Sequence, residues 1–222
     1  MNTPANREAV GLPFTLSGMR HARAQTFDAV HRIAAGIRPG MSEQQACDVA
    51  QLTLEQMGME RLWHQIIVRF GPSTLKIFKE RIAPQRLLGS NDIFFIDLGV
   101  VWQGHEGDAG ATFVVGEDSE MQACARAAQT LWRDVAARWR ADGLSGDALY
   151  QYAAQRATEM GWTLNLDIRG HRVSDFPHAI YRAGSLGDYS DCPNPGLWVL
   201  EIQIAHPTRP FGAFYEDLLI AD

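Results

Sequence analysis

The chain has 222 residues, of which 46% are hydrophobic and 21% charged, and its formal net charge is −6. This length allows one sizeable core, so we expect a single domain over residues 1–222, with residues 1–17 as an N-terminal extension. Scattered Lys and Arg residues argue against nucleic-acid binding. The lack of a long apolar run or a signal-peptide pattern argues for a cytoplasmic protein without membrane contact.

Two helices are predicted at the start of the chain. Apolar residues recur at helical spacing over residues 17–37. A second helix follows Ser42, whose hydroxyl can cap it while the Gln45 side chain returns the hydrogen bond. Gly58 is the residue type that ends such a helix.

Strands are predicted next. β-Branched and aromatic side chains are dense in WHQIIVRF (63–70) and in DIFFIDLGVVW (92–102). The second segment is almost wholly apolar, which indicates a buried strand. We expect a turn over residues 103–107 and a third strand over residues 111–115.

The second half of the chain repeats this order. A helix with apolar positions between Met121 and Trp139 ends at Gly143, and another runs from Ser145 to Gly161. A loop then leads into the strand LWVLEIQIAH.

An internal duplication accounts for this repetition. Residues 39–58 and 142–161 align at a constant offset of 103 (142 − 39). Each helix-helix-strand unit alone would expose one apolar sheet face, so the two copies must pack together. We therefore predict an α+β domain with a pseudo-twofold axis.

Acidic residues interrupt the apolar strands of both halves. A carboxylate in such a strand is costly to bury without a cation, and two neighbouring carboxylates repel each other unless a positive charge lies between them. Four carboxylates and one imidazole form an oxygen-rich set that favours Mn, Fe, Co or Zn, and so many negative charges suit a pair of divalent metal ions. The candidate ligands are Asp97, Asp108, His171, Glu201 and Glu216.

At these residues the sequence resembles the superfamily of methionine aminopeptidase, aminopeptidase P and creatinase, whose five metal ligands occur in the order Asp, Asp, His, Glu, Glu. The resemblance covers residues 18–222 and is carried by IDLG, GHEGDAGATF, GHRVSDFPH, EIQIAHP and FGAFYEDLLI. It implies the pita-bread fold, a mostly antiparallel curved sheet with helices on its outer face. The nearest likeness is to a single-domain Xaa-Pro aminopeptidase.

The resemblance also implies a role for each ligand. Asp97 would bind one metal, His171 and Glu201 would bind the other, and Asp108 and Glu216 would bridge the two. Glu201 is similar to the acid–base residue of these peptidases.

Other positions bear on substrate binding. His178 resembles the imidazole that contacts the substrate carbonyl, whereas the other substrate histidine of the family falls at Lys79 or Glu80 and is missing. Family glycines after the metal histidine are replaced by Arg172 and Ser174, and an arginine of the aminopeptidase P group is matched by Ala111.

Several side chains allow two interpretations. His64 either lines the cleft and binds substrate or lies at a sheet edge. Arg172 either pairs with an acid such as Asp175 or anchors a substrate carboxylate, and a guanidinium suits the second role. His105 and Glu106 are expected in the turn, as turn residues or as groups that orient a ligand.

We therefore expect a dinuclear metal-dependent hydrolase of amide bonds, with Mn favoured, that acts on short peptides as an Xaa-Pro-type aminopeptidase. The alternatives are a creatinase-like hydrolase of a small amidino or amide metabolite, and an inactive binding protein on the same fold. A homodimer, if formed, would be built from this domain.

Overall fold

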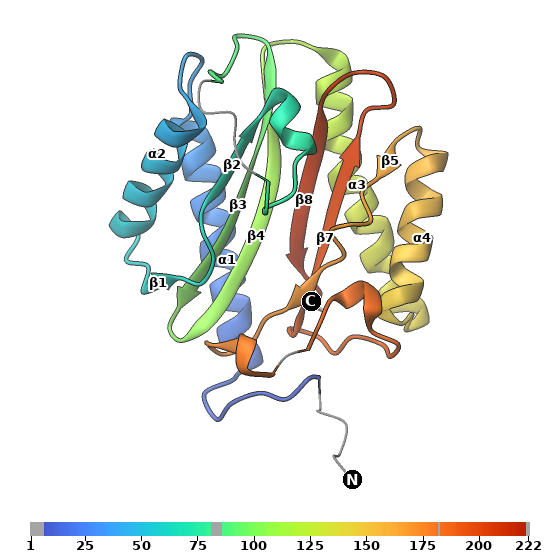
Figure 1. The fold of residues 1–222 in the computed structure, drawn as a ribbon. Helices are drawn as coiled ribbons and strands as arrows, with labels where there is room; N and C mark the ends of the chain where they lie inside the picture. Colours follow the sequence, from blue (N-terminus) through green and yellow to red (C-terminus); the bar gives the residue numbers. More distant parts are fainter. Residues whose placement is uncertain (1–6, 81–85, 182, 221–222) are drawn as a thin grey trace.

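The computed structural model describes residues 7–80, 86–181 and 183–220, so residues 1–6 of the predicted extension lie outside it. Its eight strands form one sheet. Six of them follow one another in the order β1-β3-β4-β8-β7-β5, and the other two, β2 and β6, pair with β3 and β7 respectively. The four long helices cover one face of this sheet (Figure 1). Within the described residues, no helix is long and apolar enough to cross a membrane.

The first half of the chain places two helices before a long hairpin. Its elements are α1 (Leu16–Gly36), α2 (Glu43–Gln56), β1 (Arg61–Leu62), β2 (Ile67–Phe70), the 3-10 helix η1 (Gly71–Leu75), β3 (Asp92–Trp102) and β4 (His105–Val115).

The second half repeats this order. Its elements are α3 (Ser119–Asp142), α4 (Gly146–Glu159), β5 (Thr163–Leu164), β6 (His171–Arg172), the 3-10 helices η2 (His178–Tyr181) and η3 (Leu186–Asp188), β7 (Trp198–Ala205) and β8 (Gly212–Leu218).

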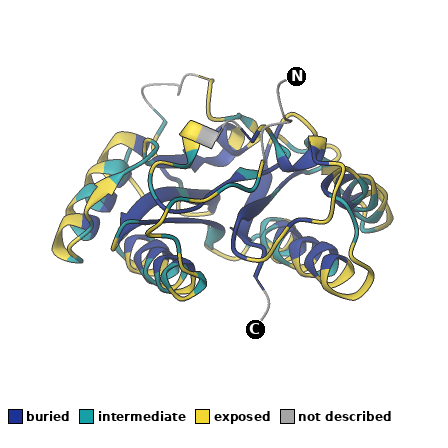
Figure 2. Cartoon of the chain, turned by 90° about the horizontal axis from the view of Figure 1, so that it is seen from below, coloured by how far each residue is buried: buried dark blue, intermediate teal, exposed yellow. Residues whose placement is uncertain are grey.

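The repetition extends to individual elements and to the core. Helices α2 and α4 are offset by 103 residues at both ends (146 − 43 and 159 − 56). One apolar cluster lies under α1 and α2 against β3 and β4, and another lies under α3 and α4 against β7 and β8. Figure 2 shows the buried strands between the helices, whose outer residues are exposed. The α+β fold with two similar halves is confirmed.

The helix ends follow the expected chemistry. Ser42 and Gln45 form the predicted capping box of α2. Gly143 ends α3 with a left-handed backbone (φ 61°), a conformation that costs glycine little.

Two strand predictions were wrong. Within segment 63–70, only β2 is a strand. The residues from Trp63 to Ile66 are irregular and connect β1 to β2. The third strand begins at His105 rather than Ala111, because the turn contains only Gln103 and Gly104. Both have positive φ (51° and 72°), as a two-residue hairpin requires. His105 and Glu106 therefore lie in β4 and are buried.

Candidate metal centre

The two hairpins bring three predicted ligands into one row across the middle of the sheet. Asp97 on β3 faces Gly110 on β4, which faces Glu216 on β8, which faces Glu201 on β7. Residues opposite one another in antiparallel strands point to the same face. Glycine at position 110 leaves this row open, because a Cβ there would lie 2.9 Å from Glu216 Oε1.

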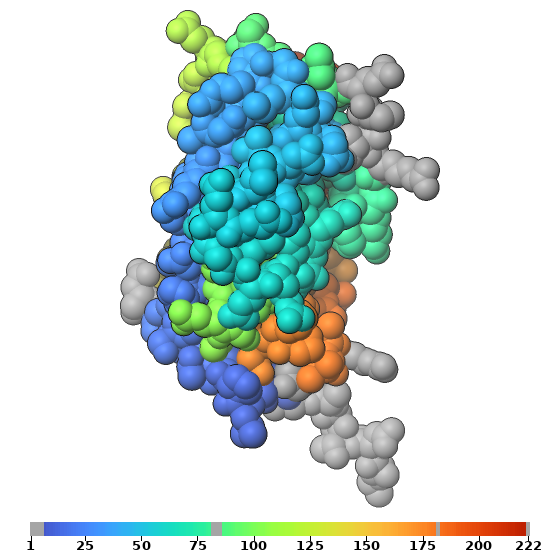
Figure 3. Space-filling view, turned by 90° about the vertical axis from the view of Figure 1, so that its left-hand side faces the viewer, coloured from blue at the N-terminus to red at the C-terminus, as the bar shows by residue number. Residues whose placement is uncertain are grey.

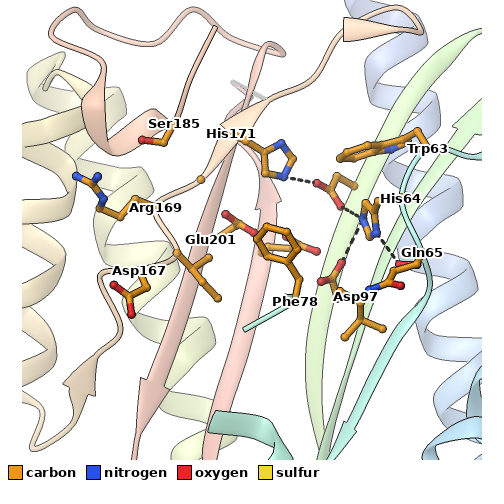
Figure 4. A pocket seen from close by; sticks show the side chains of 15 residues that line it. Trp63, His64, Gln65, Phe78, Asp97, Asp167, Arg169, His171, Ser185 and Glu201 are labelled. Carbon is orange, nitrogen blue, oxygen red and sulfur yellow. Dashed lines mark hydrogen bonds and ion pairs between the residues drawn. The ribbon is translucent and has the colours of Figure 1, made fainter. Parts of the chain in front are cut away.

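Asp108 and His171 join this row from either side. Asp108 faces Gly99, two residues along β3 from Asp97, so both carboxylates point to the same face. His171 lies on β6, opposite Val199 of β7. All five predicted ligands line one pocket of about 350 Å³. In Figure 4, His64 and His171 reach into this pocket from opposite sides.

The ligand atoms form two groups that share Asp108. His64, Asp97 and Asp108 offer atoms within 4.8 Å of one another, and so do Asp108, His171 and Glu216. His64 Nε2 lies 3.4 Å from Oδ1 of both Asp97 and Asp108, and His171 Nε2 lies 2.9 Å from Asp108 Oδ2.

Burial shifts the pKa values of the carboxyl groups in this pocket. Burial raises the pKa of Asp97 and raises the pKa of Glu201 to about 7. Burial and the neighbouring carboxylates raise the pKa of Glu216 well above its ordinary value. Asp108 differs: burial would raise its pKa, but hydrogen bonds to His171 and His64 outweigh burial and lower it.

The two histidines supply positive charge between these acids. Burial opposes ionisation of both imidazoles, but the carboxylates around them prevail. The pKa of His64 rises to about 9 beside Asp97 and Asp108, and that of His171 to about 10, mainly through Asp108.

The oxygen atoms of this pocket fit divalent cations. Glu216 Oε1 is buried and accepts no hydrogen bond from the described residues, while Asp108 Oδ2 is buried 2.9 Å from His171 Nε2. A buried oxygen without a partner is unfavourable unless an ion binds it. Carboxylate and imidazole donors together suit first-row divalent metals.

Glu201 is supported from behind by a tyrosine that the sequence did not single out as a site residue. The Tyr150 hydroxyl donates to the Glu201 carbonyl oxygen at 2.9 Å and accepts the Glu201 N–H at 3.2 Å. β5 and β6 pair with either end of β7, and the hydroxyl occupies the gap between them. Tyr150 thereby satisfies the backbone of a candidate ligand.

His178 lies beside the pocket. Its ring stacks 6.3 Å from that of His171 and meets the ring of Trp63 edge-on at 5.2 Å. Trp63 also meets His64 and His171 edge-on, and its indole N–H donates to the Gly107 carbonyl. The sequence suggests Trp63 only as part of a strand, but in the structure its ring contacts three candidate site histidines.

Arg172 lies away from this pocket. Its side chain is 1% exposed and donates to the carbonyl oxygens of Arg7 and Ala9. Because neighbouring residues of a strand point to opposite faces, His171 in the pocket places Arg172 on the other side. Among the described Arg and Lys residues, Arg169 lines the pocket, and it pairs with Asp188 at 2.8 Å.

The open antiparallel sheet, its duplicated halves and its acidic pocket define a metalloprotein with the pita-bread fold. The model of metallopeptidase family M24 matches residues 17–220, and the chain belongs to that family. The predicted family resemblance is thus confirmed.

Solved structures of the same fold are similar along nearly the whole chain. An X-Pro aminopeptidase from Thermotoga maritima MSB8 is 17% identical with a TM-score of 0.73, over 93% of this chain and 61% of the other. A prolidase from Pyrococcus furiosus is 17% identical with a TM-score of 0.75, over 97% and 63%. A Xaa-Pro dipeptidase from Bacillus anthracis is 17% identical with a TM-score of 0.71, over 97% and 62%.

The chain therefore spans about three fifths of the length of these proteins. No curated protein matches it.

Proposed function

We propose that this chain is a dinuclear metal-dependent hydrolase of amide bonds that acts on short peptides as an Xaa-Pro-type aminopeptidase. One observation carries the proposal: four carboxylates and His171 line a single pocket in which the buried Glu216 Oε1 accepts no hydrogen bond from the described residues. The family membership and the prolidase-like neighbours support the same conclusion.

Each ligand has a proposed place. Asp97 would hold one divalent ion, His171 and Glu201 the other, and Asp108 and Glu216 both. The two atom groups that share Asp108 support the placement of Asp97 and His171 on different ions with Asp108 between them, whereas Glu216 belongs to the His171 group alone and Glu201 to neither. Bound divalent ions lower the pKa of water and polarise a carbonyl group, and the carboxylate-rich set favours Mn(II).

Two side chains would handle the reacting groups. Glu201 lines the pocket among the other proposed ligands, and its carboxylate is proposed to take up and return the proton. His178, beside His171, is proposed to contact the substrate carbonyl. His64 is proposed to bind substrate at the Asp97 side of the pocket, where its ring already lies.

The rest of the pocket suits a short substrate with an apolar part. Ile67, Phe78 and Ile168 line the wall beside Asp97 and Glu201. Phe95 and Phe214 lie behind this wall. Such a surface can hold a prolyl ring or another apolar side chain.

Hydrolysis by the Mn(II)-loaded protein tests the proposal. The panel contains Xaa-Pro dipeptides, peptides with N-terminal Met, and amidino compounds such as creatine. We expect Xaa-Pro dipeptides to be cleaved and Glu201→Gln to lose about 100-fold or more of kcat.

The matched control is Asp217→Asn. Asp217 neighbours Glu216 but pairs with Arg23 rather than lining the pocket, so its substitution should spare kcat. Turnover of the amidino compounds alone, or of none of the panel, would contradict the proposal.

A further inference from the structure

Glu106 is a buried carboxylate with no role in the proposed ligand set. It lies on β4, two residues before Asp108, and is 2% exposed. Acidic side chains are rarely buried so completely unless every oxygen has a partner. The partners of Glu106 therefore indicate what the side chain does.

The Glu106 side chain contacts one segment, the stretch that carries His171 and His178. Oε1 accepts the His178 backbone N–H at 3.0 Å, and Oε2 accepts the Ser174 N–H at 3.1 Å. Oε2 also lies 2.6 Å from His178 Nδ1. On the face in Figure 3, orange atoms of this segment lie directly against the light-green atoms of the hairpin tip.

The backbone of the same two segments is joined as well. The Glu106 N–H donates to the Ser174 carbonyl at 2.9 Å, and the Phe176 N–H donates to the Gly104 carbonyl at 2.9 Å. The hairpin that carries Asp97 and Asp108 is thus fixed to the segment that carries His171 and His178. The Glu106 side chain adds a contact with an imidazole nitrogen of His178.

This contact determines which ring nitrogen bears the proton. Backbone N–H groups can only donate, so both Glu106 oxygens act as acceptors. An ionised Glu106 has no proton to donate, so His178 Nδ1 acts as the donor, and the hydrogen bond fixes the ring orientation. Nε2, on the opposite side of the ring, is the atom left for a substrate.

We propose that Glu106 is a positioning residue that orients His178 through its Nδ1–H and so presents Nε2 to the substrate. The inference rests on the proposed function, because it gives His178 a substrate to meet. A carboxylate that only joined the hairpin to the neighbouring segment would need hydrogen bonds with the two backbone N–H groups. It would not need a hydrogen bond with the imidazole.

The first test is the protonation of His178, read by NMR on metal-free protein labelled with ¹⁵N-histidine. His178→Ala identifies the signals. We expect Nδ1 to carry its proton, in a hydrogen bond that shifts or disappears in Glu106→Gln. In that variant an amide NH₂ replaces one oxygen and meets an N–H donor. A His178 whose Nδ1 lacks the proton would overturn the proposal, whether or not the protein hydrolyses any peptide.

The second test is a double-mutant cycle with the peptide substrate. Glu106→Gln should lower kcat/KM about 10- to 100-fold, the range for a residue that orients a site histidine, while metal content stays constant. The loss should vanish in a His178→Ala background. An equal loss in both backgrounds, or loss of metal with activity, would overturn the assignment.

A matched control lies on the same hairpin. The Glu60 carboxylate accepts the Gly104 N–H at the hairpin tip and makes no hydrogen bond to His178 within the described residues. Glu60→Gln should leave both the NMR signal and kcat/KM unchanged. A control variant that reproduced the effect of Glu106→Gln would show that hairpin stability, not His178, is being measured.

Discussion

The Tyr150 hydroxyl holds both backbone polar groups of Glu201, a residue proposed to bind metal and move a proton. Burial raises the pKa of this phenol well above 10, so its proton stays available for donation. One hydroxyl therefore closes the gap in the sheet behind this carboxylate.

Removing this hydroxyl should cost stability. Tyr150→Phe keeps the buried ring but leaves the N–H and C=O of Glu201 without their partner, which costs about 1–3 kcal/mol of unfolding free energy. Urea denaturation measures the loss. Tyr152→Phe, on the same helix with its ring beside Arg138, is the control and should change little. A Tyr150→Phe protein as stable as wild type would refute the role.

At the residue level, the sequence predicted which residues converge but not how they are supported. The four acidic candidate ligands could be chosen because acids in apolar strands need a cation, and His171 through the family resemblance. Tyr150 and Trp63 could not be chosen, because their roles depend on contacts across 51 and 44 positions of the chain that no local pattern encodes. The sequence suggests Glu106 as a turn residue or a group that orients a ligand, but its contact with His178 spans 72 positions.

At the element scale, the short strand β6 is held in place by Arg172, which the sequence suggested as a partner of an acid or an anchor for a substrate carboxylate. This strand contains only His171 and Arg172, yet it carries a candidate ligand. Arg172 ties it to the segment before α1 through the carbonyl oxygens of Arg7 and Ala9. Asp175 ties the same segment by accepting the Gly11 N–H at 2.9 Å.

Arg172 is therefore expected to act on stability. Arg172→Ala removes charge-assisted hydrogen bonds from a buried site and should lower the unfolding free energy by about 2–3 kcal/mol. KM and metal content should stay the same, because the side chain lies outside the pocket lining. Thermal unfolding and KM are measured together, with Arg32→Ala at an exposed helix pair as control. A raised KM at unchanged stability would restore the role of substrate anchor.

The elements themselves were largely predictable, since helix caps and apolar strands are local signals. The β3 strand, the capping box of α2 and the glycine at the end of α3 all occur where the pattern placed them. The start of β4 was predicted wrongly, because the two-residue turn needs a positive φ at Gln103, which is unusual for a residue other than glycine.

At the scale of the whole molecule, the buried acids link metal binding to pH. Burial raises the pKa of Glu201 from 4.5 to about 7, so the folded metal-free protein holds a proton that the unfolded chain releases. The pKa of His171 rises from 6.5 to about 10, so its contribution is present below pH 6.5 and is lost as pH rises toward 10. Both shifts make the metal-free protein less stable as pH increases.

Divalent metal should reverse this trend. Metal ions bind the deprotonated ligands, so the rise in Tm caused by Mn(II) should grow between pH 5.5 and 8 by an amount on the order of several degrees. Differential scanning calorimetry with and without chelator measures it. The trend should disappear in Glu216→Gln, whereas a Tm increment independent of pH would contradict the link.

Metal stoichiometry tests the central claim most directly. Elemental analysis of Mn(II)-loaded wild type should give about two ions per chain, as a pair of ions sharing carboxylates requires. Asp108→Ala and Glu216→Ala, which each remove a proposed bridge, should lower occupancy at both positions, whereas Asp217→Asn should retain the wild-type content. Unchanged metal content in the two bridge variants would contradict the assignment of these five ligands.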